Sequence, residues 1–200
     1  MQNWLSLPNR QTIKRLTFQK QLSLAQKALV HWAKVDDYTA VLDMDCSNGK
    51  LLEYYLNRYH LRACGISSSA EELNASQTLL NNKAEVLRAD KHDIPFRSSS
   101  FDNVFISEPF YDLNRFTEVF DEVKRVIKPG GQVVIAVAGH HLLSRIGHRF
   151  KNRSGIQSPE NPFHLMQLLH RHGFTDVSMR LSSFQYATVL AYSGSPKEQQ

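Results

Sequence analysis

Two spacings of apolar residues divide this chain. Before residue 35, apolar residues recur at helical spacing, which predicts one amphipathic helix within residues 10–34. After residue 39, short apolar runs alternate with further helical patterns. The runs predict strands at 40–44, 63–66, 85–89, 103–107 and 133–137. The helical patterns between them predict helices that carry Leu51 and Leu52, then Leu73 and Leu80, and then the apolar face of 113–127.

Polar residues and turn formers indicate where some of these helices begin and end. Ser69 is a typical helix N-cap, and Glu72 three residues later predicts a reciprocal capping box. Lys128 suits the negative end of the helix at 113–127. The Pro-Gly-Gly sequence at 129–131 is expected to terminate that helix.

The last quarter predicts one more helix and a hairpin. Pro162 is tolerated at the first position of a helix, and Gly173 is expected to end it. Strands at 174–180 and 184–192 leave no room for a crossover helix, so they predict an antiparallel pair. The alternation elsewhere predicts a doubly wound α/β sheet. In such sheets ligands bind beyond the carboxyl ends of the strands, beside the first strand, which points to VLDMDCSNGK at 41–50.

Composition limits the class of protein. The chain has 200 residues, of which 42% are hydrophobic and 22% charged, as expected for one globular domain. It has no apolar run of about 18 residues, and its first ten residues do not resemble a secretory signal, so neither a membrane span nor export is expected. Two cysteines, Cys46 and Cys64, fall near predicted strands, and two buried thiols favour a reducing, cytoplasmic location. A net charge of +5 does not by itself imply nucleic acid.

Three segments resemble the class I S-adenosylmethionine-dependent methyltransferases, in particular their type 11-like domain. VLDMDCSNGKLLEYY resembles the motif VLD-x-G-x-G-x-G, RADKHDIPFRSSSFDNVFIS resembles the third and fourth segments, and FDEVKRVIKPGGQVVIAV resembles EV-x-RVLKPGG. The resemblance implies a Rossmann-like seven-stranded sheet with a C-terminal antiparallel hairpin. It assigns 1–35 to a helical extension, 36–193 to the methyltransferase-like domain and 194–200 to a flexible tail. A nicotinamide-binding Rossmann enzyme, the alternative, shares the glycine turn but not the KPGG segment.

The resemblance implies that S-adenosylmethionine binds at the strand ends. Asp43 would hold the methionine end of the cofactor, and Asp90 would accept a hydrogen bond from the adenine amino group. Gly49 would allow the following helix to pack closely on the strand. The implied cofactor-binding residues are Asp43, Asp45, Cys46, Ser47, Gly49, Ser67, Ser68, Asp90, Lys91 and Ser107.

Three of these positions depart from the family pattern. Asp45 and Ser47 replace glycines, and a side chain forced to positive φ there would cost about 1 kcal/mol. Ser67 replaces the usual Asp or Glu that binds the ribose hydroxyls, a loss of about 1–3 kcal/mol in binding free energy. Glu71 and Glu72 are close enough in sequence to be considered as replacements. Two hypotheses therefore stay open: a cofactor-dependent methyltransferase, and a non-catalytic methyltransferase-like binding module.

The acceptor side is less defined by the sequence. Glu108 and His140 follow the fourth and fifth strands and are candidate general bases by position alone. The sequence SEPFY at 107–111 only partly matches the (N/D/S)-P-P-(Y/F) motif of enzymes that methylate nucleic-acid bases. A small-molecule acceptor is expected, and the basic stretch 145–153 indicates an anionic acceptor or, as an alternative, contact with nucleic acid. The histidines lack metal-ligand spacing, so no metal site is expected.

Overall fold

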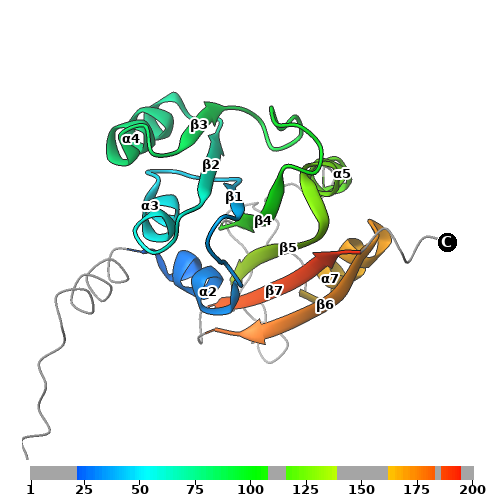
Figure 1. Cartoon of the computed structure of the whole chain (residues 1–200). Coiled ribbons are helices and arrows are strands. Elements are labelled where there is room, and N and C mark those ends of the chain that lie inside the picture. Colours follow the sequence, from blue (N-terminus) through cyan, green and yellow to red (C-terminus); the bar gives the residue numbers. More distant parts are fainter. Residues whose placement is uncertain (1–21, 108–115, 139–161, 183–185, 195–200) are drawn as a thin grey trace, which may run out of the picture.

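The computed structural model describes residues 22–107, 116–138, 162–182 and 186–194. Seven strands form one sheet in the order β3-β2-β1-β4-β5-β7-β6 (Figure 1). The strands are β1 (Ala40–Asp43), β2 (Arg62–Ser67), β3 (Glu85–Arg88), β4 (Phe101–Ile106), β5 (Ile127–Ala138), β6 (Phe174–Leu181) and β7 (Tyr186–Ser193). The helices are α2 (Leu24–Trp32), α3 (Lys50–Leu56), α4 (Ala70–Leu80), α5 (Phe116–Val126) and α7 (Pro162–Arg171).

The direction of the strands confirms the predicted doubly wound sheet with its hairpin. Strands β1 to β5 pair in parallel, whereas β7 is antiparallel to both β5 and β6. The chain moves from β1 outward to β2 and β3, then returns to β4 on the other side of β1. The strand order therefore reverses between β1 and β4, and the ends of these two strands mark the switch point of the sheet.

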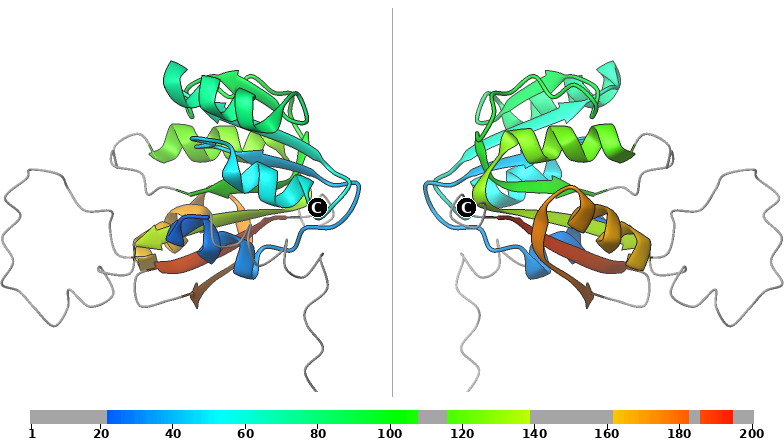
Figure 2. Two further views of the ribbon diagram at one scale, coloured as in Figure 1. Left: turned by 90° about the vertical axis from the view of Figure 1, so that its left-hand side faces the viewer. Right: turned by 90° about the vertical axis from the view of Figure 1, so that its right-hand side faces the viewer.

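Helices cover both faces of the sheet (Figure 2). Helices α2, α3 and α4 pack with one face, and α5 and α7 pack with the other. The central strands are buried on both sides: Val41 and Phe105 face the α3 layer, while Leu42 and Val104 face the α5 layer. Burial on both faces explains why these strands are continuous apolar runs in the sequence. No helix within the described ranges is long and apolar enough to cross a bilayer.

Helix α2 falls within the range predicted at 10–34, but the prediction of one continuous helix there is wrong, because Leu22 and Ser23 are not helical and Ser23 is an extended N-cap. It begins after Ser23, whose hydroxyl accepts a hydrogen bond from Gln26 N at 3.1 Å, while Gln26 Oε1 accepts from Ser23 N at 3.1 Å. This capping box was not predicted from the sequence. The helix is fixed to the sheet by Thr188, whose hydroxyl donates to the carbonyl of Ala28 at 3.1 Å. Residues 10–21 lie outside the described ranges, and the division of the chain at 35 and at 193 stays a prediction.

The Pro-Gly-Gly segment differs from its prediction. Helix α5 ends at Val126 and Ile127 begins β5, so Lys128 and 129–131 are not a helix end but an irregular part of β5, between the pairs Ile127–Phe101 and Gln132–Asn103. Asp102 provides the reason, because its carboxylate binds Lys128 Nζ at 2.7 Å and accepts from Ala40 N at 2.8 Å. Lys128 is thereby held beside β4 and β1. Gly131 permits this approach, since a Cβ there would lie 3.0 Å from the Asp102 carbonyl oxygen.

Candidate functional site

Four predicted residues meet at one edge of the sheet, which is called the site edge below. Asp43 ends β1 and Ser67 ends β2, while Asp90 and Ser107 follow the ends of β3 and β4. Backbone hydrogen bonds join the turns beyond these strands: Met44 N donates to Phe105 O at 3.0 Å, and Cys46 N donates to Ile66 O at 3.1 Å. Ala89 N donates to Ser67 O at 3.1 Å. The carboxyl ends of four neighbouring strands thus form one connected surface.

The turn between β1 and α3 has a different residue in the left-handed region than expected. Asp45 does not have positive φ, whereas Ser47 (φ 42°) and Gly49 (φ 79°) do. The backbone cost therefore falls on Ser47, and Asp45 contributes bulk and charge only. A Cβ at Gly49 would lie 3.0 Å from Leu80 Cδ1 and 3.2 Å from Ser76 Cβ. Gly49 is thus needed for close packing against α4, whose side chains supply the nearest atoms at this position.

Cys46 is fully buried and packs against β2. A Cβ at Gly65 would lie 2.7 Å from Cys46 Cβ, so the turn can rest on β2 only because residue 65 is glycine. Burial raises the pKa of the Cys46 thiol to about 12, and the nearby Asp43 carboxylate adds to the shift. The thiol is therefore protonated at neutral pH and free of any disulfide, as is the buried thiol of Cys64. The role of Gly65 was not predicted, because it depends on a contact between two separate segments.

Asp43 is the most unusual ionisable group of the site edge. Its side chain has no exposed surface, and burial, reinforced by the charge of Asp45, raises its pKa from 3.8 to about 7. Oδ1 accepts from Asp45 N at 3.3 Å and from the Ser107 hydroxyl at 3.4 Å. Oδ2 is also buried, and it has no hydrogen-bond partner among the described residues. A buried carboxylate oxygen without a donor costs free energy unless a ligand supplies the donor.

Asp45 and Lys91 form an ion pair across the site edge. The Lys91 ammonium, from the loop after β3, contacts Asp45 Oδ2 in the turn after β1. Since β2 lies between β3 and β1, the Lys91 side chain passes the end of β2 to make this contact. Both side chains are about three-quarters buried, with 27% of Lys91 and 24% of Asp45 exposed. Lys91 also lowers the pKa of Asp43, although desolvation outweighs this effect.

Glu72 does not close the capping box predicted for α4. Ser69 does accept from Glu72 N at 3.3 Å, which confirms it as the N-cap. The Glu72 carboxylate, however, accepts from the Ser67 hydroxyl at 2.7 Å, and Ser69 N donates to Ser67 Oγ at 3.1 Å. In the predicted capping box, Ser69 N would have donated to the Glu72 carboxylate. Here Ser69 N and the Glu72 carboxylate both bind the Ser67 hydroxyl instead. A carboxylate therefore stands at the end of β2, the position where the sequence has serine.

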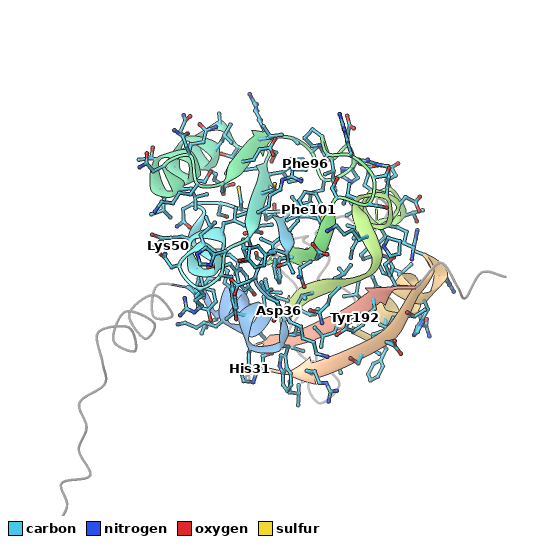
Figure 3. The ribbon with its side chains drawn as sticks, in the orientation of Figure 1. His31, Asp36, Lys50, Phe96, Phe101 and Tyr192 are labelled. Carbon is cyan, nitrogen blue, oxygen red and sulfur yellow. The ribbon has the colours of Figure 1, made fainter. Side chains whose placement is uncertain are left out.

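Asp90 binds within its own loop. Its Oδ1 accepts from His92 N at 3.0 Å and also contacts the His92 ring, while 60% of the Asp90 side chain is exposed. The next residues are anchored to α5, because Arg125 donates to the carbonyls of Ile94 and Phe96 at 2.8 and 2.7 Å. Phe96 meets Phe101 edge to face, with ring centroids 5.1 Å apart (Figure 3). This part of the site edge is held by the core and by α5.

Several predicted site residues cannot be placed. Glu108, His140 and the basic stretch 145–153 lie outside the described residues. Ser68, also predicted to bind cofactor, is exposed, and its carbonyl accepts from Arg88 Nε at 3.3 Å. Within the described residues, no group of three or more His, Cys, Asp or Glu side chains is arranged to hold a metal ion.

Comparison with known sequences finds similarity to methyltransferases. The family described as "Methyltransferase domain" matches residues 42–135. A demethylmenaquinone methyltransferase of Clavibacter sepedonicus is 34% identical over 76 residues, which are 38% of this chain and 31% of that protein. A chloroplastic tocopherol O-methyltransferase of Arabidopsis thaliana is 31% identical over 110 residues, 52% of this chain and 31% of the relative. O-methyltransferase rstn1 of Aspergillus nomiae is 28% identical over 148 residues, which are 67% of this chain and 63% of that protein. The chain thus spans less than two thirds of each relative.

Solved structures agree on the fold. A methyltransferase of Haloferax volcanii in complex with the Trm112 methyltransferase activator has a TM-score of 0.71 at 16% identity, covering 90% of this chain and 93% of its own. A SAM-dependent methyltransferase of Aquifex aeolicus has a TM-score of 0.66 at 18% identity, and the match covers 90% of this chain and 98% of that one. Haemonchus contortus phosphoethanolamine N-methyltransferase 2, in complex with S-adenosyl-L-methionine, has a TM-score of 0.65 at 14% identity, with 85% and 52% covered. These likenesses and the family match confirm the predicted resemblance and the class I methyltransferase fold.

The raised pKa of Asp43 predicts a pH-dependent stability difference. Because this pKa is about 7 in the fold and 3.8 ordinarily, the stabilisation from neutral Asp43 is complete below about pH 4 and is lost as pH rises through 7. Asp43→Asn lacks this loss, so its free energy of unfolding relative to wild type should rise by about 3 kcal/mol between pH 5 and pH 8, or roughly 6–12 °C in Tm. Thermal unfolding at several pH values measures this. Asp36→Asn, at an exposed carboxylate, should follow wild type, and parallel curves for Asp43→Asn would contradict the prediction.

Proposed function

Because the chain has the class I methyltransferase fold and matches a methyltransferase-domain family over residues 42–135, we propose that it transfers a methyl group from S-adenosylmethionine to a small-molecule acceptor. The observation that supports this most directly is the Asp43 carboxylate. Its Oδ2 atom is buried and has no donor among the described residues, which is what an ammonium-bearing ligand would correct. The bound cofactor would supply an already activated methyl group on its sulfonium.

Asp43 suits the ammonium of the methionine end. One oxygen is held by Asp45 N and the Ser107 hydroxyl, so the carboxylate is oriented, and the other oxygen remains to accept. Since Asp43 has no exposed surface, a ligand reaches it only if neighbouring groups move aside. Among the described residues, Asp45 and Lys91 supply the charges that shift the pKa of Asp43. We therefore infer that these two side chains are the groups that move aside when a ligand reaches Asp43.

The ion pair between Asp45 and Lys91 also has the chemistry that the methionine end needs. A free amino acid group carries one ammonium and one carboxylate, and the pair offers one carboxylate and one ammonium. When the ligand binds, Asp45 would pair with its ammonium and Lys91 with its carboxylate, so that every charge keeps a partner. This matters because both side chains are only about a quarter exposed, and an unpaired charge there would be costly. Asp45 is thus proposed to assist binding despite replacing a glycine.

Glu72 is proposed to bind the ribose diol in place of the acid missing at Ser67. Its carboxylate already stands at the end of β2, where Ser67 donates to Oε2 at 2.7 Å. A carboxylate has further acceptor positions and can take hydrogen bonds from a vicinal diol in addition. Ser67 would then orient Glu72 through the hydroxyl contact. Asp90, in the loop after β3, keeps its expected role toward adenine as a proposal.

The acceptor is proposed to be a small molecule because the named relatives are demethylmenaquinone and tocopherol methyltransferases. Glu108 and His140 remain candidate general bases, and 145–153 remains a candidate contact for an anionic acceptor or nucleic acid. A cytoplasmic location is proposed from the two free, buried thiols.

Calorimetric titration with S-adenosylmethionine tests the cofactor proposal. Micromolar binding is expected, strongest between about pH 7 and 8: below this range Asp43 is protonated, and above it the cofactor's own amino group loses its proton. Below pH 7 affinity should fall about tenfold per pH unit, and binding should release a proton, seen as a buffer-dependent heat. No binding of S-adenosylmethionine or S-adenosylhomocysteine at about 1 mM would instead support the non-catalytic binding module.

The charges around Asp43 predict opposite shifts in that pH profile. Asp45 raises the pKa of Asp43, and Lys91 lowers it. Asp45→Asn should therefore move the acid limb of cofactor affinity to lower pH, and Lys91→Met should move it to higher pH. The same titrations, repeated at each pH, measure both limbs. Lys83→Met removes an exposed cation elsewhere and should leave the profile unchanged. Shifts of the same sign in both variants would rule out this electrostatic coupling.

Glu72 can be tested against its neighbour Glu71, which is also exposed and in the first turn of α4. Glu72→Gln replaces a charge-assisted acceptor by a neutral one and should weaken cofactor binding about tenfold. Glu71→Gln should change the affinity less than twofold, since only Glu72 contacts Ser67. Calorimetry of both variants at pH 7.5 gives the comparison. Equal effects would show that general acidity, not the position of Glu72, is responsible.

A further inference from the structure

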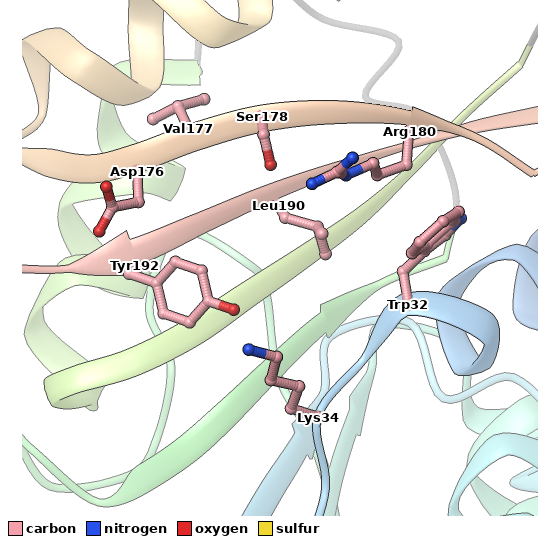
Figure 4. Close-up of a pocket in the computed structure, with 8 residues that line it drawn as sticks. All are labelled: Trp32, Lys34, Asp176, Val177, Ser178, Arg180, Leu190 and Tyr192. Atoms are coloured by element: carbon pink, nitrogen blue, oxygen red, sulfur yellow. The ribbon is translucent and has the colours of Figure 1, made fainter.

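A hollow lies on the α2 face of the hairpin, well away from the site edge. It is lined by Trp32, Lys34, Asp176, Val177, Ser178, Arg180, Leu190 and Tyr192 and has a volume of about 560 Å³ (Figure 4). It is called the β6 hollow below. It forms because α2 packs on β5 and β7 and ends at Trp32, so the same face of the edge strand β6 is left open.

The walls of the β6 hollow are fixed by a chain of hydrogen bonds. Trp32 Nε1 donates to the Ser182 hydroxyl at 3.1 Å, which holds the indole against β6. Lys34 N donates to Gln132 Oε1 at 3.0 Å, and Gln132 Nε2 donates to the Tyr192 hydroxyl at 2.7 Å. Because the Tyr192 oxygen accepts this bond, its own proton is directed elsewhere. The segment after α2 is therefore held at a set distance from the hairpin.

Two cations point into this space from opposite walls. In Figure 4 the side chains of Lys34 and Arg180 both extend toward the centre of the hollow. Neither is paired with a carboxylate within the part of the chain that the structure describes, and the Arg180 guanidinium is held 5.6 Å from the centroid of the Trp32 ring. Ser178 lies beside Arg180 on β6. Asp176 adds one carboxylate to the same lining, so the two cations leave an excess of positive charge that a bound anion would offset.

The register of the sheet separates the β6 hollow from the site edge. Leu190 pairs with Val134 on β5, Val134 with Phe105 on β4, and Phe105 with Asp43 on β1. Three steps across the sheet correspond to about 14 Å, and β6 is one strand farther. A ligand in the β6 hollow would therefore not occupy the position of a ligand bound at Asp43.

We propose that the β6 hollow binds a phosphate monoester, with the dianionic phosphate between Lys34 and Arg180 and the organic part against Trp32 and Leu190. Two cations match a dianion, and the hydroxyls of Ser178 and Tyr192 can donate to phosphate oxygens. Asp176, at one end of the lining, repels a second phosphate group. A polyanion such as nucleic acid needs a row of cations, so the small single anion fits this lining better.

Calorimetry with phenyl phosphate and with inorganic phosphate tests this site. Sub-millimolar binding of phenyl phosphate is expected, about fivefold tighter than inorganic phosphate because of the ring, and phenol should not bind at about 10 mM. Lys34→Gln and Arg180→Gln should each weaken phenyl phosphate at least about tenfold. Asp176→Asn should act in the opposite direction and tighten binding about threefold. Asparagine also tolerates the positive φ of 48° at this position.

Two matched variants locate the binding. Lys83→Gln removes an exposed cation far from the hollow, and Lys91→Met removes the cation of the site edge, so both should bind phenyl phosphate as wild type does. Absence of binding at about 10 mM phenyl phosphate would overturn the proposal. So would unchanged affinity in Lys34→Gln and Arg180→Gln, or a loss of affinity in Lys91→Met equal to theirs.

Discussion

A carboxylate removed from water at the end of β1 is the constraint around which the site edge is organised. Asp43 has no exposed surface, and its pKa of about 7 corresponds to a cost of about 4 kcal/mol for holding it ionised in the fold. That is a large share of the 5–15 kcal/mol that typically separates folded from unfolded domains. Asp45 N and Ser107 stabilise only one of its oxygens. Such a group is tolerated in a fold chiefly where a ligand uses it, which is why Asp43 carries the functional proposal.

The departures from the family pattern at the site edge are each matched by a side chain from another element. Asp45 adds a negative charge beside Asp43, and Lys91 reaches past the end of β2 to compensate it. Ser67 removes an acid from β2, and Glu72 of α4 brings one back to the same strand end. The sum of charges near the proposed cofactor position is therefore closer to the usual pattern than the motif suggests. For this reason the substitutions do not by themselves favour a non-catalytic module.

Local patterns in the sequence were sufficient to predict the order of strands and helices along the chain and the C-terminal hairpin, and they bring the predicted site residues to one edge of the sheet. Apolar runs and turn residues encode these features within a few positions of where they act. The errors occur where a side-chain contact, near or distant in sequence, decides the position of a residue. Lys128 was assigned to a helix end because Asp102, which holds it in β5, lies 26 residues away. Glu72 was assigned to a cap because the orientation of Ser67 cannot be read from spacing, and the burial that shifts Asp43 depends on packing from both faces of the sheet.

The negative charge of the site edge would favour binding of the cofactor over binding of the demethylated product. The acids of the site edge, Asp43, Asp45, Glu72 and Asp90, outnumber the cations Lys91 and Arg88 among the residues discussed. Under the proposed function, this edge would attract a ligand that carries a sulfonium and an ammonium. Methyl transfer leaves a neutral thioether, and the attraction lost for unit charges about 6 Å apart is about 3 kcal/mol at an effective dielectric constant of about 20. In the proposed reaction the demethylated product would then be held less strongly than the cofactor, which would favour turnover. The same negative edge repels phosphate, so an anion that enters the β6 hollow and a cationic cofactor at Asp43 would be sorted by charge to separate sides of one sheet.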